Sequence, residues 1–170
     1  ETVKLVTIKS KREIEYMKEA CKVVAKMYEK LKEEIRPGMT TWELDQIAEK
    51  TIRSLGAIPA EKGYDIGIKG VPPYPASTCI SINDEVIHGI PKANRILKEG
   101  DIVSIDLGAA KNGYNGDNAA TFACGTVSDE AKRLMDTTRE SLYKGIEQAV
   151  PGNRIGDIGA AVQQHCESQG

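Results

Sequence analysis

The sequence predicts an α+β fold in which helices cover an antiparallel sheet. Two observations support this prediction. Apolar residues recur at three- and four-residue steps toward both ends of the 170-residue chain, whereas the middle holds short extended segments between glycine- and proline-rich turns. One such turn is Lys111-Asn112-Gly113, which is typical of a hairpin joining two antiparallel strands.

The first third of the chain predicts two amphipathic helices. Ser10 and Glu13 form a capping box at the start of the first, which ends at Pro37-Gly38. Its apolar face is predicted to hold Ile14, Met17, Cys21, Val24, Met27 or Tyr28, Leu31 and Ile35. The second is capped by Thr40 or Thr41 and stops at Gly56. Its predicted inward residues are Trp42, Leu44, Ile47, Ala48 and Ile52.

The middle of the chain predicts strands, and the last third returns to helices. We expect a loop at 63–75, strands at 77–82, 101–108 and 114–124, and a short extended piece at 86–91. After Ser128, apolar residues again follow a helical period as far as Pro151-Gly152. A last helix is predicted from about 154 to 169.

The two helical regions share a pattern. A shift of 114 residues places Pro37-Gly38 on Pro151-Gly152 and keeps the apolar positions that follow in phase, with Leu44 on Ile158. We therefore predict a tandem repeat, with a helix–helix–sheet unit over residues 1–127 and the helical start of a truncated second unit over 128–170. The alternative is two unrelated helical hairpins that happen to share a Pro-Gly turn.

Composition excludes several classes of protein. Hydrophobic residues make up 40% and charged residues 28%, so a folded core is expected and disorder is not. No apolar run is long enough to span a membrane, and the start lacks the apolar region of a secretory signal. A net charge of −2, with one Trp and one Phe, argues against specific nucleic-acid binding. Four scattered cysteines without a C-x-x-C pair predict reduced thiols in an intracellular protein.

Asp106 and Asp117 flank the predicted hairpin turn. Any loop with an even number of residues sets both carboxylates on one face, either directly opposite or diagonal, whereas a three-residue loop with a bulge separates them. Two carboxylates this close within an apolar strand favour a cation between them. The alternative is that both are solvated residues near a turn, where Asp is common.

Two further side chains are candidates for function. His88 ends an extended segment beside Gly-Ile-Pro, where loops carry functional groups, although a lone histidine is more often a surface or core residue. Tyr74 lies in the proline-rich loop and could line a pocket or simply pack. His165, in the last helix, is interpreted as structural or surface.

Three segments together resemble type I methionine aminopeptidase. They are Ser-Thr-Cys-Ile-Ser-Ile-Asn-Asp-Glu-Val-Ile-His-Gly-Ile-Pro at 77–91, Gly-Asp-Ile-Val-Ser-Ile-Asp at 100–106 and Gly-Tyr-Asn-Gly-Asp at 113–117. The resemblance extends over essentially the whole chain. It implies the pita-bread fold, in which two pseudo-symmetric helix–sheet halves surround a central site. This chain would supply the first half and the opening helices of the second.

The resemblance also implies an activity and a site. The activity is metal-dependent removal of the initiator methionine from nascent polypeptides in the cytoplasm. Two divalent ions, of cobalt, manganese, iron or zinc, are held by two Asp, one His and two Glu. The Asp positions match Asp106 and Asp117, with Asp117 bridging both ions. The catalytic, substrate-contacting histidine matches His88, and an aromatic residue of the methionine pocket matches Tyr74.

The departures from this family set further expectations. The metal-binding His and both Glu belong to the second sheet, which this sequence does not include, so we expect the chain alone to be inactive and to hold metal weakly. It would be completed by a C-terminal half or would self-associate. The 71–73 segment, Val-Pro-Pro, replaces an aromatic residue and a glycine of the pocket. Two alternatives are a non-catalytic pita-bread binding module, against which His88 and both Asp argue, and a proline-specific dipeptidase, against which His-Gly-Ile-Pro argues.

Overall fold

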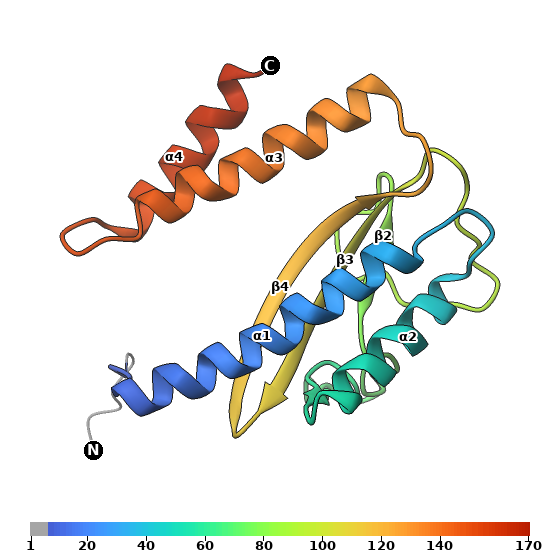
Figure 1. Ribbon diagram of the computed structural model, residues 1–170, viewed down its shortest axis with the longest axis horizontal. Coiled ribbons are helices and arrows are strands. Elements are labelled where there is room, and N and C mark those ends of the chain that lie inside the picture. Colours follow the sequence, from blue (N-terminus) through green and yellow to red (C-terminus); the bar gives the residue numbers. More distant parts are fainter. Residues whose placement is uncertain (1–6) are drawn as a thin grey trace. The chain divides into compact units, whose positions relative to one another are not determined.

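The computed structural model describes residues 7–170, which form two compact units, one ending at Thr126 and the other spanning Val127–Gly170. The first unit contains α1 (Lys11–Glu34), α2 (Thr41–Ser54), β1 (Ile58–Pro59), β2 (Cys79–Ile82), β3 (Ile102–Lys111) and β4 (Tyr114–Ala123) (Figure 1). The second contains α3 (Asp129–Glu147) and α4 (Ile155–Ser168). The predicted α+β class, with an antiparallel sheet beside helices, is confirmed.

Both helices of the first unit begin at the predicted caps. The backbone N–H of Ser10 donates to Glu13 Oε2 at 2.7 Å, and the N–H of Glu13 donates to Ser10 Oγ at 3.3 Å. Thr40 and Glu43 repeat this reciprocal arrangement at the start of α2. The sequence therefore fixes both helix starts locally, because each cap satisfies backbone donors that have no partner within the helix.

β3 is the central strand of the sheet. β4 pairs with it antiparallel along its whole length, from Ile102↔Ala123 to Lys111↔Tyr114. Along its other edge β3 pairs with β2 near its start and with β1 near its end. The two-residue turn has φ of 54° at Asn112 and 78° at Gly113. Positive φ at both positions suits a hairpin turn whose twist matches the strands, and Asn-Gly adopts it readily.

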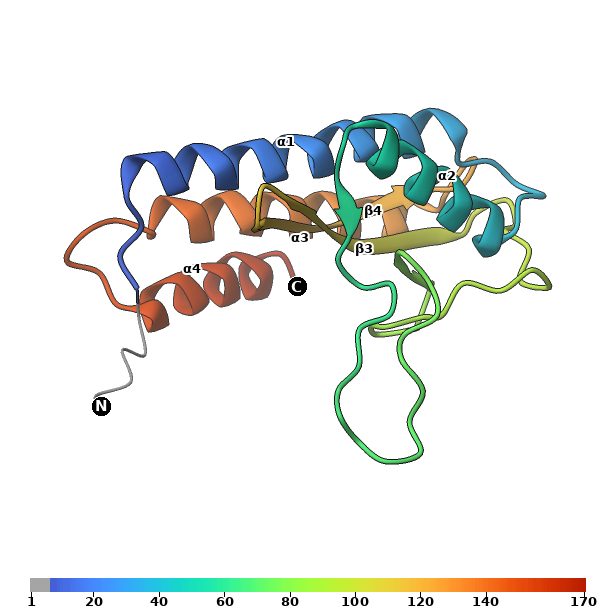
Figure 2. The ribbon, with the colours of Figure 1, turned by 90° about the horizontal axis from the view of Figure 1, so that it is seen from below.

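Helices α1 and α2 cover one face of this sheet (Figures 1 and 2). The core between them is built from fully or almost fully buried side chains: Val24, Met27, Leu31, Leu44, Ala48 and Ile52 from the helices, and Ile80, Val103, Ile105, Leu107 and Ala109 from the strands. Tyr28 enters it from α1, and its hydroxyl donates to the carbonyl of Ile105 at 2.9 Å. The sheet residues in this core alternate along β3, so the intervening residues point away from the helices.

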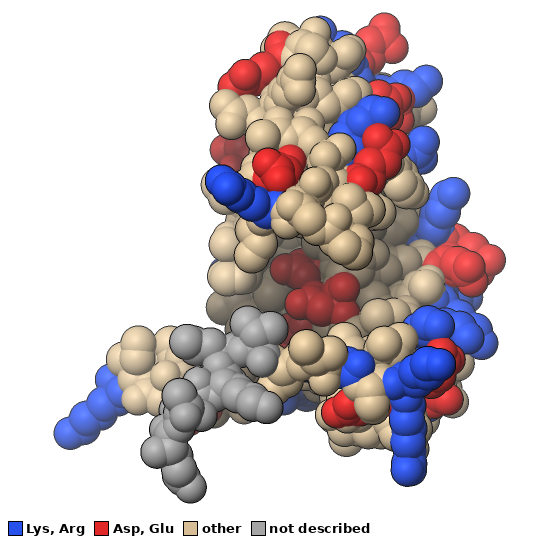
Figure 3. Space-filling model, turned by 90° about the vertical axis from the view of Figure 1, so that its left-hand side faces the viewer, with Lys and Arg blue, Asp and Glu red and all other residues tan. Residues whose placement is uncertain are grey.

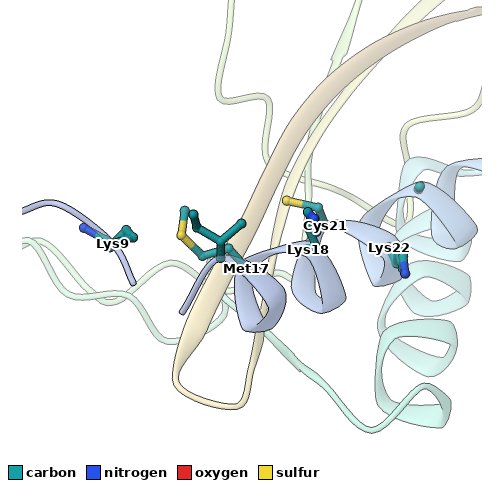
Figure 4. Close-up of a pocket in the computed structure, with 7 residues that line it drawn as sticks. Lys9, Met17, Lys18, Cys21 and Lys22 are labelled. Atoms are coloured by element: carbon teal, nitrogen blue, oxygen red, sulfur yellow. The ribbon is translucent and has the colours of Figure 1, made fainter. Parts of the chain in front are cut away.

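Some predicted inward positions are wrong. Trp42 is 38% exposed and Ile14 is 42% exposed. Ile14, Met17 and Cys21 instead line an open hollow of about 530 Å³ along α1 (Figure 4). For Ile14 the cause is the length of the sheet: Tyr16 stacks on Tyr114, the first residue after the hairpin turn, so the part of α1 before Tyr16 extends past the end of the strands. The two-residue strand β1 was not predicted.

In the second unit, α3 and α4 pack against each other around Gly145. A Cβ at this glycine would lie 3.0 Å from Val162 and 3.3 Å from Ile158, so the small residue permits the close approach. Leu134, Leu142 and Ile146 are each more than half exposed, and residues 127–170 include no strand that could cover them. That this unit opens a second repeat, as predicted for 128–170, stays a prediction.

Two properties of the described residues bear on partners. Between residues 7 and 170, no helix combines the length and the apolar character that crossing a bilayer requires. The face drawn in Figure 3 carries basic as well as acidic side chains, in keeping with a net charge of −2. This face therefore does not present the uniformly basic surface that binding to a phosphate backbone requires.

Candidate functional site

The hairpin places Asp106 and Asp117 on the same face of the sheet. Asp106 pairs with Ala119, and Asp117 pairs with Gly108, so the two aspartates are diagonal neighbours across β3 and β4. Side chains in this relation lie about 7–8 Å apart at most, within reach of a shared ion or ion pair. The face is the one that α1 and α2 leave uncovered, since Ile105 and Leu107, which alternate with Asp106, point into the core.

The charge of Asp117 acts on the carboxyl group of Asp106. The pKa of Asp106 is raised, first because burial disfavours its charged form and second because the charge of Asp117 lies nearby. A charge on His88 acts in the opposite direction on Asp106, so this histidine belongs to the same neighbourhood. Like charges brought together at a half-buried position favour either a proton or a bound cation.

His88 is held at the site by the glycine that follows it. The N–H of Ile80 donates to the carbonyl of Gly89 at 2.7 Å, and the N–H of Gly89 donates to Ser81 Oγ at 3.2 Å. A Cβ at Gly89 would lie 2.1 Å from the Ile80 carbonyl oxygen, so only glycine fits against β2 here. His88 itself has φ of 58° and is exposed. The turn therefore presents an exposed imidazole next to the carboxylate face.

Tyr74 is anchored beside the same strand. Its hydroxyl donates to the carbonyl of Thr78 at 3.0 Å, and the next residue along, Cys79, pairs directly with Asp106. Burial is the largest cause that raises the pKa of the Tyr74 phenol and that of the Cys79 thiol, and the two groups also influence each other. Tyr74 is thus a half-buried wall of the region around Asp106, which is the position that a pocket residue would need.

Glu61 is a site residue that sequence reasoning missed. Its Oε1 accepts a hydrogen bond from the N–H of Gly108, and its Oε2 is buried without a partner among the described residues. A Cβ at Gly108 would meet Glu61 Oε1 at 3.1 Å, so this carboxylate takes the space of the missing side chain, opposite Asp117. Burial, followed by smaller effects of Asp117 and Asp106, raises the pKa of Glu61 to about 7.

Asp45 is a second carboxylate that the sequence did not indicate, and it anchors the segment that leads into β2. Its Oδ1 accepts from the N–H groups of Ser77 and Thr78, each at 2.9 Å, and from Thr78 Oγ1 at 2.8 Å. Burial nevertheless raises its pKa. Asp45 therefore fixes the segment that leads from Tyr74 into β2. Neither Glu61 nor Asp45 lies in a recognisable motif, and only the fold brings them to their partners.

The donor set fits a divalent cation but is sparse. Carboxylate oxygens suit hard divalent ions, and Asp106 and Asp117 present theirs from a rigid pair of strands. Among residues 7–170, however, no three His, Cys, Asp or Glu side chains converge closely enough to hold a metal ion. The structure thus provides two carboxylates on one face of the hairpin, and between residues 7 and 170 no third metal-binding side chain is grouped with them.

Comparison with known proteins identifies the family. The model of metallopeptidase family M24 matches residues 15–170. The chain belongs to metallopeptidase family M24.

Individual relatives refine this assignment. Methionine aminopeptidase 1 of Bacillus subtilis is 48% identical over 165 residues, which are 97% of this chain and 63% of that protein. A methionine aminopeptidase of Clostridium acetobutylicum is 49% identical over 166 residues, 98% of this chain and 64% of that protein. The chain therefore spans a little under two thirds of the length of these relatives. The predicted resemblance to methionine aminopeptidases is confirmed.

Solved structures agree. The crystal structure of a methionine aminopeptidase from Thermotoga maritima superposes with a TM-score of 0.89 at 39% identity, covering 96% of this chain and 63% of that one. An X-Pro aminopeptidase from the same organism reaches a TM-score of 0.78 at 22% identity, over 95% of this chain and 42% of that chain, and so shares the fold. The predicted pita-bread fold, of which this chain forms a part, is confirmed, and the proline-specific alternative is not favoured.

Proposed function

We propose that the protein containing this sequence removes the N-terminal methionine from nascent polypeptides, and that this chain supplies the first part of its metal site. The observation that carries the proposal is the hairpin register, which sets Asp106 and Asp117 on one open face. Its support is the M24 match and the 48–49% identity to proteins named methionine aminopeptidases. The binding-module alternative is not favoured, since the aspartates and His88 are present.

Each residue has a proposed role. Asp106 and Asp117 would contribute ligands to a pair of divalent ions, and the ions when bound would supply Lewis acidity and lower the pKa of a bound water. His88, exposed on its glycine-anchored turn, would donate a hydrogen bond to the peptide group that is cleaved. Tyr74 would form a wall of the pocket for the first side chain. Cobalt, manganese, iron and zinc all suit such a centre.

We propose that the other three ligands, one His and two Glu, come from a segment beyond this sequence. Two aspartates alone would bind divalent ions weakly, so this chain by itself would be inactive. The substrate is a newly made polypeptide, which places the protein in the cytoplasm. The free thiols of Cys21, Cys79, Cys124 and Cys166 agree with the reducing conditions there.

A reconstitution experiment tests the proposal. This chain is mixed with a separately produced segment that carries the other three ligands, manganese or cobalt is added, and release of methionine from a Met-Ala-Ser peptide is measured. We expect turnover that Asp117→Ala abolishes and Asp136→Ala, at an exposed position of α3, leaves intact. Turnover by this chain alone would show that it is already a sufficient catalyst. A failure of the mixture, with both parts folded, would contradict the proposed activity.

A further inference from the structure

A side chain takes the place of a backbone acceptor where the pairing of β1 with β3 ends. Strand β1 pairs with β3 as far as Ala109. One step further, the N–H of Ala60 donates to the carbonyl of Gly108 at 3.0 Å. In a regular antiparallel ladder the N–H of Gly108 would return a hydrogen bond to the carbonyl of Ala60. It donates instead to Oε1 of Glu61, so this carboxylate completes the edge of β3.

The same carboxylate is the side-chain neighbour of Asp117 across the strands. A Cβ at Gly108 would lie 3.1 Å from Glu61 Oε1, so the carboxylate lies beside the position that a side chain of Gly108 would have. Gly108 pairs with Asp117, and paired residues point their side chains to the same face. Because Gly108 directs its N–H and its carbonyl away from β4, this is the close kind of pair, with Cα atoms about 4.5 Å apart.

The backbone next to Asp117 is fixed from the other face of the sheet. Gly116 is buried, and a Cβ there would lie 2.6 Å from the backbone of Ala20 and Cys21, so α1 packs directly against β4 at this point. Asp117 itself is exposed, so close packing around its own side chain does not set its direction. That direction depends on the group that lies across from it, which is the carboxylate of Glu61.

We propose that Glu61 is a positioning residue for Asp117: it binds the N–H of Gly108, fills the space beside this glycine and so directs the carboxylate of Asp117 toward Asp106. This inference rests on the proposed function, in which Asp117 binds divalent ions. Glu61 is not itself a ligand in this arrangement, because its Oε1 is bonded to Gly108 and its Oε2 is buried. Groups that hold a metal ligand in place typically change metal affinity by about ten- to a hundredfold.

The test separates the position of this carboxylate from its charge. In the complete protein that contains this sequence, the affinity for manganese is measured from the electron paramagnetic resonance signal of the free ion. Glu61→Asp keeps the charge but is one methylene too short to reach Gly108, and we expect it to weaken the affinity about tenfold. Glu61→Gln keeps the length and an oxygen acceptor but loses the charge, and the affinity should stay within about twofold. Glu33→Asp, at an exposed position of α1, is the matched control and should change nothing.

Each outcome decides between supporting and overturning this role. A weakened Glu61→Asp beside an intact Glu61→Gln supports it, whereas the reverse pattern, equal losses or no losses overturn it. Circular dichroism checks that each variant is folded. If Glu61→Asp does not fold, Gly108→Ala replaces it and should weaken the affinity likewise, because its Cβ displaces the carboxylate.

The parent protein distinguishes this inference from the proposed function. If it binds manganese but releases no methionine from a Met-Ala-Ser peptide, the proposed function fails, and the affinities of the variants still decide the role of Glu61. If the parent protein binds no manganese, both proposals fail.

Discussion

The two faces of the β3–β4 hairpin differ completely in environment, although their residues alternate along the same strands. On one face Val103, Ile105 and Leu107 are fully buried under α1 and α2. On the other, Asp117 and Thr121 are exposed, and Asp106 is half-buried. The comparison shows that packing of one face supplies the rigidity, whereas the other is left free to carry charged groups at fixed positions.

The largest effect is expected on the packed face. Leu107→Ala removes a fully buried side chain between the sheet and α1, and we expect it to reduce the free energy of unfolding by about 2–5 kcal/mol. Thr121→Ala, on the exposed face, should cost less than about 1 kcal/mol. Urea unfolding measures both. Equal losses would show that the two faces do not differ as described.

The second-largest loss of stability is expected at Gly116, which lies on the same packed face in close contact with α1. A Cβ at Gly116 would lie 2.6 Å from the backbone of Ala20 and Cys21 in α1, so Gly116→Ala forces the helix away from the strand. We expect a loss of about 1–3 kcal/mol in the free energy of unfolding. Gly159→Ala, in α4 with open space around it, should be neutral or stabilising. If both variants unfold at the same urea concentration as the parent, α1 does not pack on β4 at this distance.

On the face of the sheet opposite the helices, the third effect is a dependence of the free energy of unfolding on pH. Because the pKa of Glu61 is raised to about 7, the folded protein binds its proton more tightly than the unfolded chain does. The stability that comes from this proton is present below about pH 4.5 and is lost as the pH rises through about 7. Glu61→Gln should therefore be increasingly more stable than the parent chain between about pH 5 and 8. A stability difference that stays constant with pH would argue that Glu61 is not buried.

The smallest effect concerns the aspartates. Asp117→Asn removes the nearby charge that helps to raise the pKa of Asp106, so that pKa should fall while the contribution of burial remains. Carboxyl carbon chemical shifts measured against pH follow it directly. Asp136→Asn, on α3, should leave it unchanged. If Asp117→Asn, like Asp136→Asn, leaves the pKa of Asp106 unchanged, the two aspartates do not lie on the same face of the sheet.

The sequence was informative where local chemistry decides the structure. The capping boxes at Ser10 and Thr40 set both helix starts, and Asn112-Gly113 set the hairpin register, one of the possible registers that place both aspartates on one face. Contacts between distant segments could not be predicted in this way. Glu61 reaches Gly108 only because the two-residue strand β1 pairs with the end of β3, and nothing near Glu61 in the sequence indicates that pairing.

The depth to which each helical residue is buried also could not be predicted from the local sequence pattern. Ile14 and Leu31 follow the same helical period, yet Leu31 is fully buried and Ile14 is 42% exposed. Periodicity identifies a face of a helix but not the length of the sheet that covers it.

The central claim is that Asp106 and Asp117 together bind divalent cations on the uncovered face of the hairpin. Paramagnetic broadening by manganese in NMR spectra of this chain tests it most directly, since weak binding suffices. We predict that broadening centres on the amides of Gly108, Asp117 and Ala119, and that Asp117→Ala removes it. Broadening that is confined to residues outside this hairpin, or that persists unchanged in Asp117→Ala, would contradict the account.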